Sequence, residues 1–172
     1  MTTPEFTLRP PISSDVYPYL AFLSNPAVSI WLEDRCQRPL IASEIKAFLF
    51  GGAWCPWAIE VEGAFAGLTG FQDPIPERSQ ARFFIVIGEP SYWGKGLGTA
   101  VTKAAVARGF NELGLRKIVS DYLSPNLASA EIHERAGFQI EGCLREDAWR
   151  EGKWADRAIV SIFGNEFGNE MV

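Results

Sequence analysis

A short segment with three glycines and one lysine, Tyr92–Ala100, has the composition of a phosphate-binding loop. Glycine lets the backbone approach a ligand closely and lets consecutive N–H groups point the same way. The segment precedes a predicted helix, whose N-terminus adds a partial charge of roughly +0.5. Both effects favour an anion such as a pyrophosphate. An ordinary tight turn between a strand and a helix is the alternative interpretation.

Two better-known phosphate patterns do not fit this segment. Gly94, Gly96 and Gly98 are spaced two apart, whereas the dinucleotide-binding pattern has a wider second gap. Lys95 is followed by Gly96, so the lysine-serine or lysine-threonine pair of a P-loop is missing. A plain nucleotide-binding domain is therefore disfavoured.

A second segment with candidate chemistry lies downstream. Asn126 follows a strand-like run, Lys117–Leu123, and is well placed as the N-cap of a short helix over Leu127–Ala136. Gly137 is a natural C-terminal stop for that helix. The capping role and a ligand-binding role for Asn126 are compatible.

The two segments in this order resemble the GNAT superfamily of acyl-CoA-dependent N-acetyltransferases. The resemblance rests on Gly96-Leu97-Gly98, on Asn126 and Ser129, and on Glu134-Arg135-Ala136-Gly137-Phe138. More narrowly, Leu8-Arg9-Pro10, Asn25-Pro26-Ala27-Val28 and Tyr92-Trp93-Gly94-Lys95-Gly96 resemble the branch that contains the ribosomal-protein N-terminal acetyltransferases. The resemblance extends over nearly the whole chain.

The resemblance implies acetyl-CoA as the cosubstrate and assigns residues to it. A backbone N–H from Ile85, Val86 or Ile87 would meet the thioester carbonyl, with Ile87 counted among the catalytic candidates. Such a preorganised donor contributes about 3 kcal/mol in the transition state. Ser129 and Asn126 would lie along the pantetheine, with Ser129 near the sulfur. The pyrophosphate would bind the backbone of Trp93, Gly94, Lys95, Gly96, Leu97, Gly98 and Thr99.

The proton transfers are less well defined. Many relatives carry a tyrosine that protonates the leaving thiolate where this chain has His133. An imidazole with a pKa near 6.5 can act as an acid to such a thiolate; a partly exposed helix residue without a catalytic part is the alternative. No general base is evident among Glu33, Asp34, Glu60, Asp73 and Asp121. This favours an acceptor amine of low pKa, which is partly neutral at physiological pH.

The acceptor side is the least determined part of the site. Trp31 and Trp149 lie in segments that flank the acceptor in the resembling family and can contact an amine by stacking or cation–π attraction. Glu33 and Arg82 complete the candidate acceptor-binding residues, although Arg35 nearly cancels the charge of Glu33. Cys36, Cys55 and Cys143 are not expected to carry a covalent intermediate.

Composition sets wider limits. The 172 residues fit one domain, and the net charge of −5 with dispersed basic residues argues against nucleic-acid binding. No apolar run approaches the length of a membrane span, and the polar N-terminal residues lack a signal-peptide core. Three widely separated cysteines argue for a reducing compartment, and one histidine beside them makes a metal site improbable. We expect a cytoplasmic protein without metal.

The pattern of apolar residues predicts an α/β fold of the α+β kind. Strands are expected at Phe6–Arg9, Trp57–Glu62, Phe65–Phe71, Phe83–Ile87, Lys117–Leu123, Gln139–Trp149 and Trp154–Phe163, and helices at Asp15–Leu23, Ser43–Phe50, Thr99–Leu113 and Leu127–Ala136. The Phe83 strand reads as buried on both faces. The resemblance implies a mixed, mostly antiparallel sheet that splays open after this strand, with helices on both faces.

The sequence thus predicts direct acetyl transfer from acetyl-CoA to a primary amine of a small molecule or of a peptide N-terminus, in a ternary complex. A non-catalytic acyl-CoA-binding or regulatory module is the alternative. Homodimerisation is an expectation from the family alone.

Overall fold

Seven strands form one mixed sheet in the computed structural model, which describes residues 2–75 and 79–167. The strands are β1 (Phe6–Arg9), β2 (Trp54–Val61), β3 (Ala64–Ile75), β4 (Gln80–Ile87), β5 (Lys117–Leu123), β6 (Gln139–Arg150) and β7 (Lys153–Phe163). Their order in the sheet is β1-β2-β3-β4-β5-β7-β6, and every pair is antiparallel except β4 with β5. The predicted mixed, mostly antiparallel sheet is confirmed.

The helices are α1 (Val16–Leu23), α2 (Pro26–Ser29), α3 (Ala42–Phe50), α4 (Leu97–Asn111), α5 (Leu127–Arg135) and α6 (Gly164–Phe167). Short 3-10 turns, η1 (Ser13–Asp15), η2 (Asp34–Gln37) and η4 (Pro90–Tyr92), join some of them. The four expected helices are present, whereas α2 and α6 were not expected. Helix α4 begins two residues before the expected Thr99, so that Gly98 lies in its first turn. The side chain of Asp73, one of the acidic candidates, lies outside the described residues.

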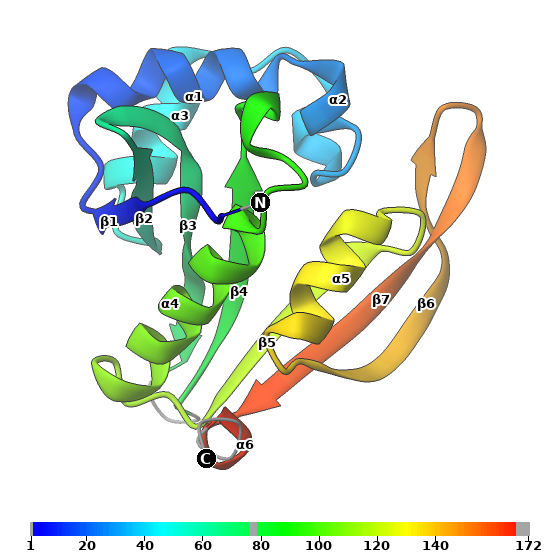
Figure 1. The fold of residues 1–172 in the computed structure, drawn as a ribbon. Helices are drawn as coiled ribbons and strands as arrows, with labels where there is room; N and C mark the ends of the chain where they lie inside the picture. The colour runs from blue at the N-terminus through cyan, green and yellow to red at the C-terminus, as the bar shows by residue number, and fades with distance from the viewer. Residues whose placement is uncertain (1, 76–78, 168–172) are drawn as a thin grey trace.

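The sheet opens between its two central strands. The described pairing of β4 with β5 covers Gln80–Arg82 and Lys117–Val119, near the start of both strands. Beyond Arg82 the strand β4 continues to pair with β3, but β5 diverges from it. Figure 1 shows the halves β1–β4 and β5–β7 separating upward from this contact. The predicted splay is therefore present, and one edge of β4 faces it.

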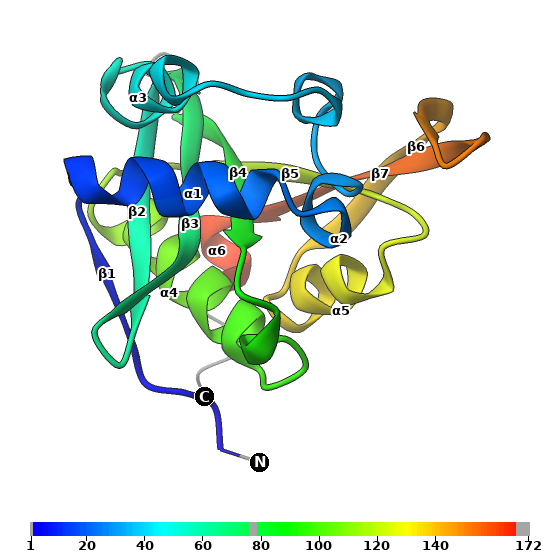
Figure 2. The same cartoon turned by 90° about the horizontal axis from the view of Figure 1, so that it is seen from above.

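Helices cover both faces of the sheet, as predicted (Figure 2). Helices α1 and α3 pack on one face, where Tyr19 and Ile45 join a buried cluster with Leu68 of β3. Helix α4 packs on the other face, with Val106 in a buried cluster that also contains Phe83 and Phe138. The two buried clusters thus hold the helices in place on the two faces of the sheet.

The prediction that the Phe83 strand is buried on both faces is wrong for its second half. Phe83 is buried, but Phe84, Ile85 and Ile87 are only partly buried. The physical reason is the splay itself, because a strand with an open edge exposes the side chains that border a cavity. A continuous apolar run therefore marks a cavity wall here as well as a core strand.

No helix among residues 2–75 and 79–167 has both the length and the apolar character that a membrane span requires. In the same residues, no three histidine, cysteine or acidic side chains are grouped so that they could hold a metal ion.

Candidate active site

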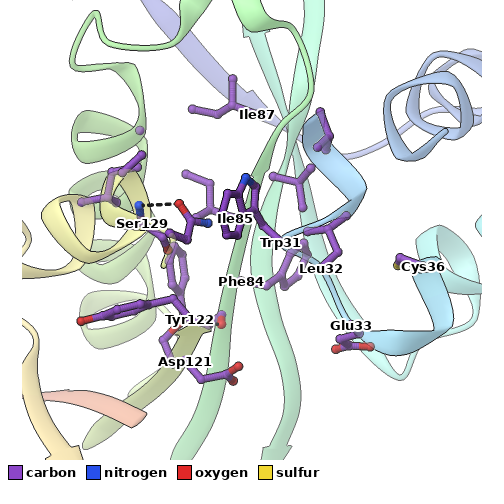
Figure 3. A pocket seen from close by; sticks show the side chains of 18 of the residues that line it. Trp31, Leu32, Glu33, Cys36, Phe84, Ile85, Ile87, Asp121, Tyr122 and Ser129 are labelled. Carbon is purple, nitrogen blue, oxygen red and sulfur yellow. Dashed lines mark hydrogen bonds between the residues drawn. The ribbon is translucent and has the colours of Figure 1, made fainter. Parts of the chain in front are cut away.

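A cavity of about 700 Å³ passes through the splay and joins its two sides. Its lining includes the loop before α4, the open edge of β4, helix α5, and the segments around α2, η2 and α3. Figure 3 shows β4 in the middle of this cavity, with Ser129 and Tyr122 on one side and Trp31 and Glu33 on the other.

The glycine-rich loop ends in an N-terminus built for an anion. Gly94 and Gly96 have φ angles of 69° and 79°, in the left-handed region that favours glycine. Gly96 is the N-cap of α4 and supplies no capping side chain. The first-turn N–H groups of the helix have no intrahelical partner, so they are available to a ligand. A side chain added at Gly94 would meet open space, so the backbone there is accessible.

The open edge of β4 presents backbone groups to the cavity. The carbonyl of Phe83 accepts from Ser120 Oγ at 3.2 Å, and that of Ile87 accepts from Trp93 Nε1 at 2.9 Å. Neither donor belongs to β3, and backbone direction alternates along a strand. The N–H groups of Ile85 and Ile87 therefore also point away from β3, while Val86 turns its backbone toward β3.

Helix α5 carries three polar residues toward the same region. The Asn126 side chain accepts a hydrogen bond from the Ser129 backbone N–H at 3.1 Å, which confirms its predicted capping role. One turn later, His133 Nδ1 lies 2.8 Å from the carbonyl oxygen of Ser129 and 3.4 Å from Ser129 Oγ. On the other side of the ring, Nε2 lies 2.9 Å from Ser120 Oγ. Both ring nitrogens thus have partners within the protein.

His133 is only 3% exposed, so the alternative of a partly exposed helix residue is wrong. Burial lowers the pKa of the imidazole, and the bond to the Ser129 carbonyl opposes that shift. A nitrogen close to a carbonyl oxygen must donate, which assigns the proton of the neutral ring to Nδ1. Nε2 then competes with the Phe83 carbonyl for the single proton of Ser120 Oγ. His133 links α5 to β5 in this form.

Aromatic and apolar side chains from distant segments form the wall that the sequence predicts to face the acceptor, called the acceptor side below. The Trp54 and Phe84 rings are 5.2 Å apart and nearly perpendicular, and Phe48 of α3 contacts both. The Arg35 guanidinium lies 5.2 Å from the centre of the Trp54 ring, a cation–π distance. Trp31, which is 36% exposed, also lines the cavity (Figure 3). This wall is apolar with a polar rim.

The carboxylates of the acceptor side are paired with arginines. Glu33 pairs with Arg35 at 2.7 Å. Asp121 pairs with both Arg82 and Arg157, and Arg157 also contacts Asp147 at 2.6 Å. The ion pairs around Asp121 and Arg157 connect the strands β4, β5, β7 and β6 at the point where the splay begins. Opposite charges therefore cancel on both walls, and neither wall presents a strong field to a cation.

Comparison with known proteins places this architecture in a family. A model of the Acetyltransferase (GNAT) domain matches residues 5–139. The L-methionine sulfoximine/L-methionine sulfone acetyltransferase of Pseudomonas aeruginosa is 33% identical over 140 residues, which cover 77% of this chain and 70% of that protein. The chain belongs to the GNAT acetyltransferase family.

Other similarities are shorter or lie in the fold alone. The spermidine N(1)-acetyltransferase of Escherichia coli K12 is 30% identical over 111 residues, or 64% of this chain, and the match spans 59% of that relative's length. A solved ribosomal alpha-N-protein acetyltransferase in complex with coenzyme A has a TM-score of 0.80 at 20% identity, covering 92% of this chain and 93% of the other. The latter supports the GNAT fold.

Not every predicted residue of the GNAT site lies at the cavity. Trp31, Glu33 and Arg82 line it, and so do Asn126, Ser129 and His133. The cofactor candidates Ile85, Val86, Ile87, Trp93, Gly94, Gly96, Leu97, Gly98 and Thr99 line it as well. Lys95 is exposed and lies outside this lining. Trp149 is also outside it: 53% exposed on the β6–β7 hairpin, it packs against Trp154.

Several cavity residues were missed from the sequence. Phe84 was assigned to a buried strand, and Ser120 carried no signal beyond its place in a strand. Cys36 was set aside as part of an early segment, yet it lines the acceptor side. Burial raises the pKa of its thiol, which keeps the sulfur protonated. Arg150, which ends β6 outside the cavity lining, was not considered at all.

Proposed function

We propose that this protein is an acetyl-CoA-dependent N-acetyltransferase that acetylates a primary amine of a small molecule or of a peptide N-terminus. The observation that carries the proposal is the continuity of one cavity. It runs from an anion-binding helix terminus, past an open strand edge, to an apolar acceptor wall. A thioester and an amine brought from opposite sides would meet at that edge.

The residues of the cradle fit the cofactor. The left-handed backbone at Gly94 and Gly96 and the first-turn N–H groups of α4 are suited to a pyrophosphate. The Trp93 indole, through its bond to the Ile87 carbonyl, fixes the loop to the end of β4. Acetyl-CoA, when bound, supplies the activated acetyl group.

The β4 edge would stabilise negative charge on the acetyl oxygen. The N–H groups of Ile85 and Ile87 point away from β3 and border the cavity, so either can donate to an oxyanion. Val86 is less suited, because its backbone is directed to β3. Held in a strand, these donors need no reorganisation during the reaction.

Ser129 is the better candidate for assisting the leaving sulfur, with His133 behind it. The ring of His133 is buried and hydrogen-bonded on both sides, so its neutral form is favoured. Ser129 lines the cavity, and its Oγ lies 3.4 Å from His133 Nδ1. We assign to Ser129 a hydrogen bond to the developing thiolate and to His133 the positioning of Ser129. The proton given up by the amine balances the one gained by the thiol.

The acceptor wall favours an amine of low positive charge. Glu33 and Asp121 are both occupied by arginines, so a polycation would have to displace an existing ion pair. Trp31, Trp54 and Phe84 offer contact area to an apolar group. An amine that arrives neutral needs no general base before it attacks, which agrees with the low-pKa acceptor that the sequence favours.

Direct transfer is part of the proposal, and Cys36 makes it testable. A thiol at the cavity is a possible site of transient acetylation, but its raised pKa opposes thiolate formation. Enzyme mixed with labelled acetyl-CoA in the absence of amine should therefore retain no label on protein. Label that disappears in Cys36→Ala would overturn direct transfer.

The deciding experiment is calorimetric titration with acetyl-CoA, followed by measurement of CoA release with a panel of amines. The panel contains L-methionine sulfone, spermidine and an alanine-initiated peptide, and ATP serves as the control ligand. Selective binding of acetyl-CoA with amine-dependent CoA release is the expected result. Binding without release for any amine would favour a non-catalytic acyl-CoA-binding module instead.

A further inference from the structure

Arg150 joins the two halves of the molecule at the open end of the splay. It ends β6, it is 7% exposed, and its partners lie more than a hundred residues away in sequence. Nε donates to the carbonyl of Ile30 at 2.9 Å, and Nη2 donates to the carbonyl of Leu32 at 2.7 Å. Nη2 also lies 2.9 Å from a carboxylate oxygen of Asp34.

The two carbonyls that Arg150 holds belong to the residues on either side of Trp31. A buried guanidinium is costly unless its donors are satisfied, and here carbonyls from both halves satisfy them, including that of Trp149 at 2.7 Å. The planar fork of arginine fixes the direction of its bonds, so it restrains both position and orientation. Gln37 of the first half also donates to the Leu32 carbonyl, at 3.3 Å, so the backbone around Trp31 is held from both halves, and Arg150 is its contact with the second.

This segment forms one wall of the acceptor side. Trp31, Leu32 and Glu33 all line the cavity (Figure 3). They belong to the half that contains β4, whereas Arg150 belongs to the half that contains α5 and Ser129. Figure 2 shows α2 on the side of the first half that faces the β6–β7 hairpin. The distance between the acceptor wall and Ser129 thus depends on this contact.

We propose that Arg150 is a positioning residue for acetyl transfer, which holds the Trp31 segment and thereby shapes the acceptor side of the cavity. The inference rests on the proposed function for its kinetic consequence, but its structural consequence is independent of it. Arg150 has no contact with the cofactor side, so acetyl-CoA binding should not depend on it.

The test compares Arg150→Ala with Arg145→Ala, a matched control because Arg145 is exposed on the same strand. Amide hydrogen exchange is followed by mass spectrometry, and acetyl-CoA affinity by calorimetry. In Arg150→Ala, exchange in residues 30–34 should accelerate about tenfold or more, since local opening becomes easier. Exchange in α5 and the dissociation constant of acetyl-CoA should stay within about twofold of the control.

The kinetic arm uses L-methionine sulfone and the alanine-initiated peptide as acceptors. Arg150→Ala should raise the KM for a productive acceptor about fivefold, because a displaced wall misplaces the amine. Arg150→Lys should recover part of this loss, since one ammonium cannot hold both carbonyls in fixed directions. Unchanged exchange in residues 30–34, or an equal rise in the acetyl-CoA dissociation constant, would overturn the proposal. If the wild-type protein acetylates no amine, the proposed function fails, while hydrogen exchange still decides the role of Arg150.

Discussion

The two sides of the cavity are built in different ways. The cofactor side is made mainly of backbone groups from one continuous segment, from the open edge of β4 through the first turn of α4. The acceptor side is made of side chains from α2, η2, α3, β2, β4 and β5. The first depends on backbone conformation and local charge. The second depends on individual side chains and on the contacts that hold their segments together.

This difference predicts two kinds of sensitivity to mutation. A substitution in the loop before α4 should weaken acetyl-CoA binding when it alters the charge or the left-handed backbone. Other substitutions there should leave the affinity unchanged. A substitution on the acceptor side should raise the KM for the amine when it removes a side chain that contacts the amine. Each of the following variants therefore tests whether the two sides behave independently.

The largest effect is expected at Gly94. Aspartate and asparagine both tolerate the left-handed region, and a side chain at this position meets open space. Gly94→Asp adds a negative charge to the cradle, which should weaken acetyl-CoA binding about thirtyfold relative to Gly94→Asn. Calorimetry in low salt measures the acetyl-CoA affinity of both variants. Equal affinities for the two variants would remove this loop from the pyrophosphate site.

A smaller effect is expected at Ser129, on the border between the two sides. Ser129→Ala removes the hydroxyl near the leaving sulfur but keeps the backbone N–H that Asn126 caps. The rate constant of CoA release at saturation should fall about tenfold, with acetyl-CoA affinity preserved. Ser91→Ala, on the exposed turn before α4, serves as the control. A full rate in Ser129→Ala would return the acid role to His133.

The two exposed tryptophans sharpen the comparison further. Trp31 lines the cavity, whereas Trp149 packs on Trp154 away from it. Trp31→Ala should raise the acceptor KM about fivefold through lost contact area, and Trp149→Ala should change it less than about twofold. Steady-state kinetics at saturating acetyl-CoA distinguishes them. The reverse order would place the acceptor on the hairpin, as the family resemblance suggested.

The smallest effect concerns pH. Because burial lowers the pKa of His133, the unfolded protein binds more protons than the folded one below about pH 6.5. The stability that the neutral ring contributes is present above that value and is lost as pH falls. The loss between pH 7 and pH 6 should be no more than about 0.7 kcal/mol, the limit set by the pKa of the unfolded imidazole, and His133→Gln should lack it. Urea unfolding at both pH values measures the difference; the same pH dependence in both proteins would contradict a neutral buried imidazole.

The cofactor side could be predicted well from the sequence because its determinants are local. The glycines, the helix that follows them and the Asn126 cap are all encoded within a few neighbouring residues. The acceptor side could not, because it depends on contacts between distant segments. Nothing local indicated that Arg150 would hold the carbonyls beside Trp31, or that a run such as Phe83–Ile87 would border a cavity. Nor did any local signal indicate that Trp149 would lie outside the cavity lining.

The short parallel contact between β4 and β5 also has a thermodynamic consequence. The chain passes from one half to the other once, between α4 and β5, so each half is assembled from a continuous stretch of sequence. A ligand that touches both α4 and α5 would connect the halves noncovalently. Binding to the folded chain alone then adds to its stability, by about 2.7 kcal/mol at a hundred times the dissociation constant. Cellular acetyl-CoA would thus help to determine how much of this protein stays folded.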